Sequence, residues 1–158
     1  MAEQVPEPPQ TGAAQDSAAQ HAQRRQFSHR LAHPADLLLV FLGGAAGTAG
    51  RAALSLVIPS LGAFPLAIFG INILGAFLLG LLYESLSRGA AGRARARRIR
   101  LLIGTGFLGG FTTYSTFALD GALLLGAAAT GTAVIYLVGT ILAGAAASWA
   151  GIVLGARR

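Results

Sequence analysis

The sequence predicts an all-α membrane protein with four transmembrane helices. The first observation is length: each of four apolar stretches exceeds the ~20 residues that a helix needs to cross a hydrocarbon core of about 30 Å. They are residues 37–58, 64–86, 101–129 and 133–154. The second is charge, since charged residues make up only 11% of the chain. The third is side-chain size: helices this rich in Ala and Gly are thin, and four of them hardly enclose a pore alone, so we expect an oligomer.

Residues 1–35 differ from the rest, because they contain Gln, Pro, Ala, Ser and scattered charge without an apolar run that could be a signal-peptide core. We predict a disordered N-terminal tail here, followed by a four-helix membrane domain over residues 36–158. The chain has no cysteine, which excludes disulfides and thiolate metal sites, and its three histidines lie in or beside the tail.

The basic residues are all arginine, and eleven of the twelve fall at residues 24–30, 88–100 and 157–158. With four spans, those three places share one side of the membrane. Arginine accumulates in short cytoplasmic loops, so we predict that both termini, including the tail, are cytoplasmic. The loop at 88–100 suits contact with anionic lipid headgroups. It is too short to offer the folded basic surface that nucleic-acid binding needs.

The first and second stretches each contain one conspicuous polar residue. Arg51 lies about two turns before the end of the first, where its long side chain can reach the interface as an anchor or attract an anion from water. Asn72 lies in the first half of the second stretch, where an amide is costly without a partner. Its sequence position leaves an interhelical hydrogen bond and a pore-facing role both open.

The third stretch is too long for a simple span. As a helix, its 29 residues would extend roughly 43 Å, so it must tilt, protrude or break. Gly109 and Gly110 are adjacent and are followed by five hydroxyl side chains at residues 112–116. A break at 109–113 would free backbone carbonyls that can coordinate a cation, provided that protein satisfies the unwound backbone.

The fourth stretch and the acids complete the polar inventory. Tyr136 and Thr140 are four apart and share a helix face, whereas Gly144 has no side chain to continue it. Glu84 is expected to be solvated or paired with the arginine loop. Asp120 lies in a span, where an ionisable group is a functional candidate by default, and its role is left open.

Three blocks in order resemble the Fluc (CrcB) family of fluoride channels. GGFTTYSTF at 109–117 is similar to the family's Gly-Gly-x-Thr-Thr-Phe-Ser-Thr-Phe signature, which breaks the third of four helices. GGAAGTAGR at 43–51 resembles its first-helix motif, and FPLAIFGINILGAFLLG at 64–80 resembles its second. The resemblance covers the chain from about Asp36 onward.

The resemblance implies a fluoride-selective channel in the bacterial plasma membrane that passively exports cytoplasmic fluoride and so reduces its toxicity. It implies an antiparallel dimer, with a structural sodium ion at the centre bound by the backbone carbonyls of Gly109 and Thr112. Arg51 corresponds to a vestibule residue. The matching anion-pathway residues are Asn72, Tyr114, Ser115, Thr116, Phe117, Tyr136 and Thr140. Tyr114 replaces a phenylalanine of the family, which keeps an electropositive ring edge and adds a hydroxyl.

The arginine bias bears on the dimer. An antiparallel homodimer requires insertion in both orientations, whereas a chain with eleven arginines against one is expected to insert in a single orientation. We therefore hypothesise pairing with a related, oppositely oriented subunit, with the homodimer as the alternative.

Other function classes fit less well. A small proton-coupled drug exporter needs a carboxylate embedded in the first helix, which has none beyond Asp36 at its mouth. A non-transporting membrane scaffold leaves the hydroxyl run at 112–116 unexplained. We expect no enzymatic activity, because no nucleophile with a nearby general base is evident within the spans.

Overall fold

The computed structural model describes residues 33–88 and 92–157, which are helical apart from short connections. The tail predicted over residues 1–35 therefore falls almost wholly outside the described residues, together with three arginines before the first helix. In order, the helical segments are α2 (Pro34–Val57), α3 (Leu66–Arg88), α4 (Arg93–Ile99), the π-helical η1 (Arg100–Leu108), α5 (Gly109–Phe111), α6 (Ser115–Gly126) and α7 (Thr130–Ala156). The expectation of an all-α protein is confirmed for this part of the chain.

Three of the described helices, α2, α3 and α7, are long and apolar enough to cross a membrane. They correspond to the first, second and fourth predicted stretches, and α2 begins at Pro34 rather than at Leu37. The third predicted stretch is divided: α4, η1 and α5 run on without a gap, and α6 follows only after residues 112–114. The predicted interruption of this helix is confirmed, but it lies at 112–114 rather than at 109–113, because Gly109–Phe111 are helical.

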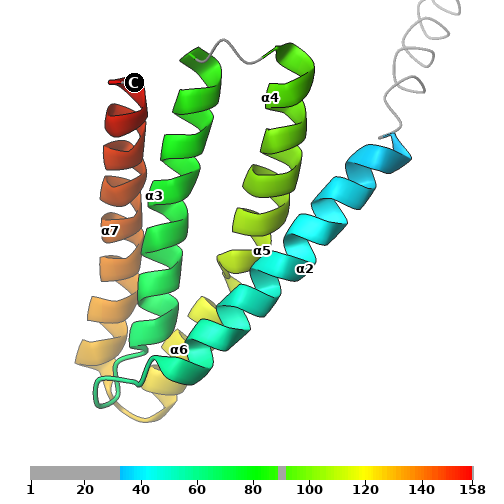
Figure 1. The fold of residues 1–158 in the computed structure, drawn as a ribbon. Coiled ribbons are helices and arrows are strands. Elements are labelled where there is room, and N and C mark those ends of the chain that lie inside the picture. The colour runs from blue at the N-terminus through cyan, green and yellow to red at the C-terminus, as the bar shows by residue number, and fades with distance from the viewer. Residues whose placement is uncertain (1–32, 89–91, 158) are drawn as a thin grey trace, which may run out of the picture. The chain divides into compact units, whose positions relative to one another are not determined.

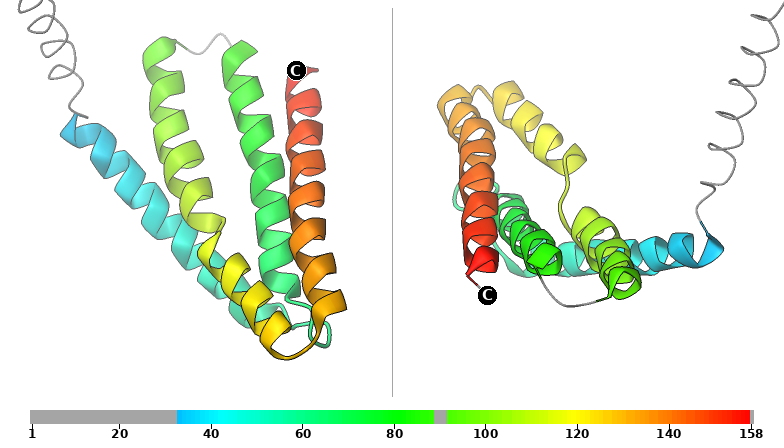
Figure 2. Two further views of the ribbon diagram at one scale, coloured as in Figure 1. Left: turned by 180° about the vertical axis from the view of Figure 1, so that it is seen from behind. Right: turned by 90° about the horizontal axis from the view of Figure 1, so that it is seen from above.

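The helices pack in two pairs, with α3 along α7 and α2 running obliquely along η1 and α5 (Figures 1 and 2). Small residues allow the second pair to approach closely. A Cβ atom at Gly43 would overlap the backbone of Leu102, and one at Gly47 would overlap that of Phe107. The spacing of four between the two glycines therefore serves close packing of helix backbones.

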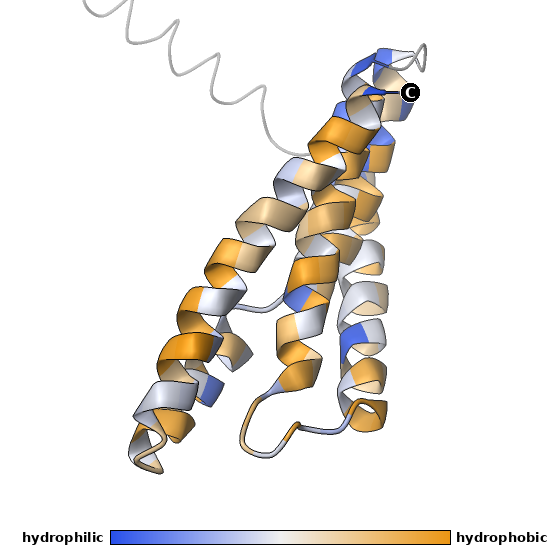
Figure 3. Cartoon of the chain, turned by 90° about the vertical axis from the view of Figure 1, so that its left-hand side faces the viewer, coloured by the Kyte–Doolittle hydropathy of each residue, from blue (hydrophilic) through white to orange (hydrophobic). Residues whose placement is uncertain are grey.

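Apolar residues predominate along the helices (Figure 3), and many large apolar side chains are exposed. Leu56, Phe41 and Trp149 are 88%, 70% and 68% exposed. A surface of this kind suits hydrocarbon rather than water, because soluble chains rarely expose apolar patches of such extent. Together with the three long apolar helices, it identifies a multi-pass membrane protein.

The end of α3, the start of α4 and the C-terminal end of α7 lie together at one end of the bundle (Figure 1). The arginines of these segments are therefore gathered there. Two ion pairs belong to the same end, joining Arg97 to Asp36 and Arg88 to Glu84. The expectation that Glu84 pairs near the arginine loop is met by Arg88.

Candidate functional site

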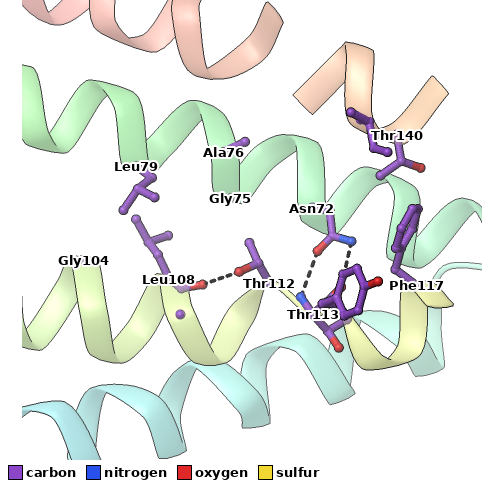
Figure 4. Close-up of a pocket in the computed structure, with 13 residues that line it drawn as sticks. Asn72, Gly75, Ala76, Leu79, Gly104, Leu108, Thr112, Thr113, Phe117 and Thr140 are labelled. Carbon is purple, nitrogen blue, oxygen red and sulfur yellow. Dashed lines mark hydrogen bonds between the residues drawn. The ribbon is translucent and has the colours of Figure 1, made fainter. Parts of the chain in front are cut away.

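The chain leaves helical geometry at residues 112–114, between α5 and α6, where Thr112 is extended with φ −75° and ψ 156°. Asn72 on α3 faces this break (Figure 4). Its Nδ2 donates to the carbonyl oxygen of Thr113 at 3.1 Å, and the N–H of Thr113 donates to its Oδ1 at 2.9 Å. One side chain thus satisfies two backbone groups that would be costly to leave unpaired within a membrane.

Several carbonyl groups lose their helical partners at the break, among them those of Gly109, Gly110 and Thr112. In a continuous helix, the N–H of Thr113 would bond the carbonyl of Gly109, and the N–H of Thr116 would bond that of Thr112. Here the N–H of Thr113 donates to Asn72, and the N–H of Thr116 donates to Oγ1 of Thr113 at 3.2 Å. The carbonyls of Gly109 and Thr112 are thus among those that the break releases from helical bonding.

The carbonyl of Gly110 receives donors from α2 instead. Thr48 Oγ1 lies 3.4 Å from this oxygen, and Arg51 Nε lies 3.3 Å from it. Glycine is required at position 110, since a Cβ atom there would overlap the carbonyl of Gly44. The part-buried guanidinium of Arg51 is therefore tied to the broken helix.

The hydroxyl groups at the break divide into two kinds. Thr112 Oγ1 donates back to the carbonyl of Leu108 at 2.9 Å, which is a common arrangement for threonine in a helix. Thr113 Oγ1 lies 3.2 Å from Ser115 Oγ and 3.3 Å from Thr116 Oγ1. Since Thr113 Oγ1 also accepts a backbone N–H from the first turn of α6, this second group caps that helix.

An aromatic cluster lies beside the break. Tyr136 is fully buried, with ring centroids 5.4 Å from Phe117 and 5.6 Å from Phe64. Its hydroxyl donates to Oδ2 of Asp120 at 3.3 Å. Tyr114 lies 6.0 Å from Phe117 by centroids yet is 80% exposed, so its ring projects out of the single chain.

A groove of about 380 Å³ runs between α3 and the broken helix (Figure 4). Of the predicted site residues, it is lined by Asn72, Gly109, Thr112, Tyr114, Phe117 and Thr140. Arg51 and Thr116 line a second cavity, of about 480 Å³, with Asp120. Tyr136 lies in the core, and Ser115 is exposed. The single chain thus distributes the predicted pathway residues over two cavities, the core and the surface.

The family model of the CrcB-like protein, Camphor Resistance (CrcB), matches residues 38–152. The chain belongs to the CrcB family. The Fluoride-specific ion channel FluC 2 of Leifsonia xyli subsp. xyli is 50% identical over 124 residues, covering 78% of this chain and 86% of that protein. The Fluoride-specific ion channel FluC of Deinococcus radiodurans is 45% identical over 125 residues, covering 76% of this chain and 94% of that protein. That of Phenylobacterium zucineum is 44% identical over 124 residues, covering 77% and 95%.

Several contacts in this CrcB chain go beyond the sequence-based expectations. Thr48 is absent from the predicted site, although its position three residues before Arg51 places both on one face of α2. The contact of Asp120 with Tyr136 depends on how α6 meets α7, and no local pattern reveals it. Thr113 was one hydroxyl among five, and the fold makes it the residue whose backbone and side chain both hold the break.

Proposed function

We propose that this chain is a fluoride-specific ion channel through which cytoplasmic fluoride leaves the cell passively, reducing fluoride toxicity. The observation that carries the proposal is the break held by Asn72, in a chain 50% identical to a protein named as a fluoride-specific ion channel. Fluoride is small and tightly hydrated, so a selective path must replace water with several donors and ring edges, without a charge that traps the ion. The groove beside the break offers the amide of Asn72, the hydroxyl of Tyr114 and two aromatic rings.

The proposed pathway uses Asn72, Tyr114, Ser115, Thr116, Phe117, Tyr136 and Thr140. The amide nitrogen of Asn72 carries two N–H bonds and needs one for Thr113, which leaves the other to contact an anion in the groove. Tyr114 and Phe117 line the same groove, and the edge of an aromatic ring is electropositive and can face an anion. Arg51 serves as the vestibule residue: its Nε bonds Gly110, while its fixed charge raises the local concentration of anions in the cavity that it shares with Thr116.

The proposed topology has four crossings of a bacterial plasma membrane, the third made jointly by η1, α5 and α6. The combined run from Arg93 to Gly126, interrupted at 112–114, supports this count because its two halves follow one another between α3 and α7. We assign the cytoplasmic side to the end of the bundle where the arginines of α3, α4 and the C-terminus lie together (Figure 1). Both termini are then cytoplasmic.

The proposed assembly is an antiparallel dimer. Three features support a second subunit. The groove is open along the single chain, and Tyr114 is 80% exposed beside it. Gly109 also faces open space, since a Cβ atom there would meet nothing within 4 Å. The partner is either a second copy or a related subunit of opposite orientation, and the arginine bias favours the latter.

The proposed cofactor is a structural sodium ion at the centre of this dimer. The carbonyls of Gly109 and Thr112, which the break releases from helical bonding, are hard oxygen ligands suited to such a cation. Bound there, sodium would supply positive charge that compensates these carbonyl dipoles. Asn72 contributes by holding Thr113 away from Gly109, which keeps that carbonyl available.

A proton-coupled exporter is disfavoured, because Asp36, the only carboxylate of α2, is ion-paired with Arg97. Growth distinguishes the two functions. We expect a bacterium that lacks its own fluoride exporter to grow in millimolar fluoride when it produces this chain, with its related subunit where the genome encodes one. Resistance to cationic drugs without resistance to fluoride would contradict the proposal.

A further inference from the structure

A third cavity, of about 490 Å³, lies at the arginine-rich end of the bundle between α3, η1 and α7. Its polar lining includes Tyr83, Ser87, Arg100 and Ser148, and its apolar lining includes Leu79 and Ile152. The function proposed above uses none of these residues.

Arg100 is the central feature of this cavity. Its Nε atom is buried and has no hydrogen-bond partner among the described residues. Its guanidinium carbon lies 5.7 Å from the ring centroid of Tyr83, within the range of a cation–π contact. The aromatic ring thus orients the guanidinium, while a buried donor without an acceptor is unfavourable. Arg100 therefore brings a positive charge and unused hydrogen-bonding capacity to the lining of the cavity.

The charges around the cavity favour an anionic ligand. Glu84 also lines it, and its carboxylate is compensated by the ion pair with Arg88. Arg95 and Arg98 on the adjoining α4 are exposed and add positive potential. A basic pocket between membrane helices, close to their cytoplasmic ends, is the kind of site that binds lipid headgroups.

The lining also has the amphipathic character of a phospholipid. Leu79 and Ile152 are 38% and 41% exposed and continue the cavity along the outer apolar surface, away from the arginine-rich end. We propose that this cavity binds an anionic phospholipid, with its phosphate at Arg100 and an acyl chain along Leu79 and Ile152. Free phosphate has the same charged chemistry as the headgroup, but it has no acyl chain to contact Leu79 and Ile152.

The test is native mass spectrometry of the full-length protein in detergent, titrated with phosphatidylglycerol or with phosphatidylcholine. We expect preferential binding of phosphatidylglycerol, weakened about tenfold by Arg100→Gln because charge-assisted hydrogen bonds are lost. Arg95→Gln is the matched control, since it removes the same charge from an exposed position on α4, and we expect a change of less than about twofold. Equal losses in both variants, or equal binding of the two lipids, would overturn the proposal.

A second variant tests the proposal even if Arg100→Gln does not fold correctly. Ile152→Trp fills the apolar part without changing any charge, and we expect it to weaken phosphatidylglycerol binding while inorganic phosphate at millimolar concentration does not displace the lipid. Displacement by inorganic phosphate, with binding unaffected by Ile152→Trp, would show a free-phosphate site and reject the lipid assignment.

Discussion

Asn72 and Thr113 lie 41 positions apart in the sequence, and two hydrogen bonds join the side-chain amide of one to the backbone N–H and carbonyl of the other. The amide donates one bond and accepts the other, as the backbones of two paired β-strand residues do. It allows α5 to end and α6 to begin within an apolar environment. The broken helix is therefore held by α3, and the position of the break is set from outside the broken helix itself.

Replacing Asn72 tests this relationship. Asn72→Leu preserves the approximate volume but leaves both backbone groups of Thr113 unpaired, which should lower the free energy of unfolding by about 2–4 kcal/mol. We expect a lower thermal midpoint in detergent and loss of fluoride flux. Leu74→Ala on the same helix, at a residue 47% exposed, is the control and should change the midpoint little. A wild-type midpoint for Asn72→Leu would show that the break does not depend on the amide.

Thr48 and Arg51 share one acceptor, the carbonyl of Gly110, so their contributions should not be additive. We expect a double-mutant cycle of Thr48→Val and Arg51→Met to give a coupling of about 0.5–1 kcal/mol in unfolding free energy. Arg51→Met should also slow the passage of fluoride from water into the channel more than Thr48→Val does, because only arginine carries a charge that attracts the anion. Strict additivity of the two stability losses would argue against the shared contact.

Tyr114 should contribute to conduction and little to stability, because its side chain is largely exposed in the single chain. Tyr114→Phe keeps the ring edge, and we expect fluoride flux to persist. Tyr114→Ile removes the ring edge, and we expect flux to fall about tenfold, the upper end of what one aromatic contact contributes. Fluoride efflux from liposomes, measured for both variants, shows whether the ring contributes to conduction. Equal fluoride flux in the two variants would show that the ring of residue 114 is not part of the anion pathway.

Sodium should stabilise the assembly if the carbonyls of Gly109 and Thr112 bind it. A ligand that binds only the folded state raises its stability in proportion to the logarithm of ligand concentration above its Kd. We expect the thermal midpoint of the purified protein to fall when N-methylglucamine replaces sodium, and to recover when sodium is restored. If the thermal midpoint does not change in this exchange, and the protein is shown to be free of sodium, the proposed sodium site is wrong.

The length and composition of the sequence were sufficient for three of the long helices, because α2, α3 and α7 are continuous apolar stretches. The break was also foreseeable from Gly109 and Gly110, followed by hydroxyl residues. Its position at 112–114, slightly beyond the adjacent glycines, depends on Asn72, which lies on another helix. The sequence shows that this amide needs a partner but does not show which one.

The π-helical winding of η1 and the pairing of Asp36 with Arg97 were not predicted. The ion pair depends on how the segment before the break lies against α2, where Gly43 and Gly47 meet its backbone. Arg51 illustrates the same limit: its distance from the helix end suggests an interfacial anchor, whereas its Nε bonds Gly110. Local spacing identifies the polar residues, and packing between helices decides their partners.

The most direct test is fluoride efflux from liposomes, read with a fluoride electrode and compared with chloride efflux under the same potential. The purified chain is reconstituted alone and, where the same genome encodes a related subunit, also together with that subunit. The account predicts rapid fluoride release with negligible chloride release, from the chain alone if it forms a homodimer and only from the mixture if it requires that partner. Absence of fluoride release from both preparations, or equal release of chloride, would contradict it.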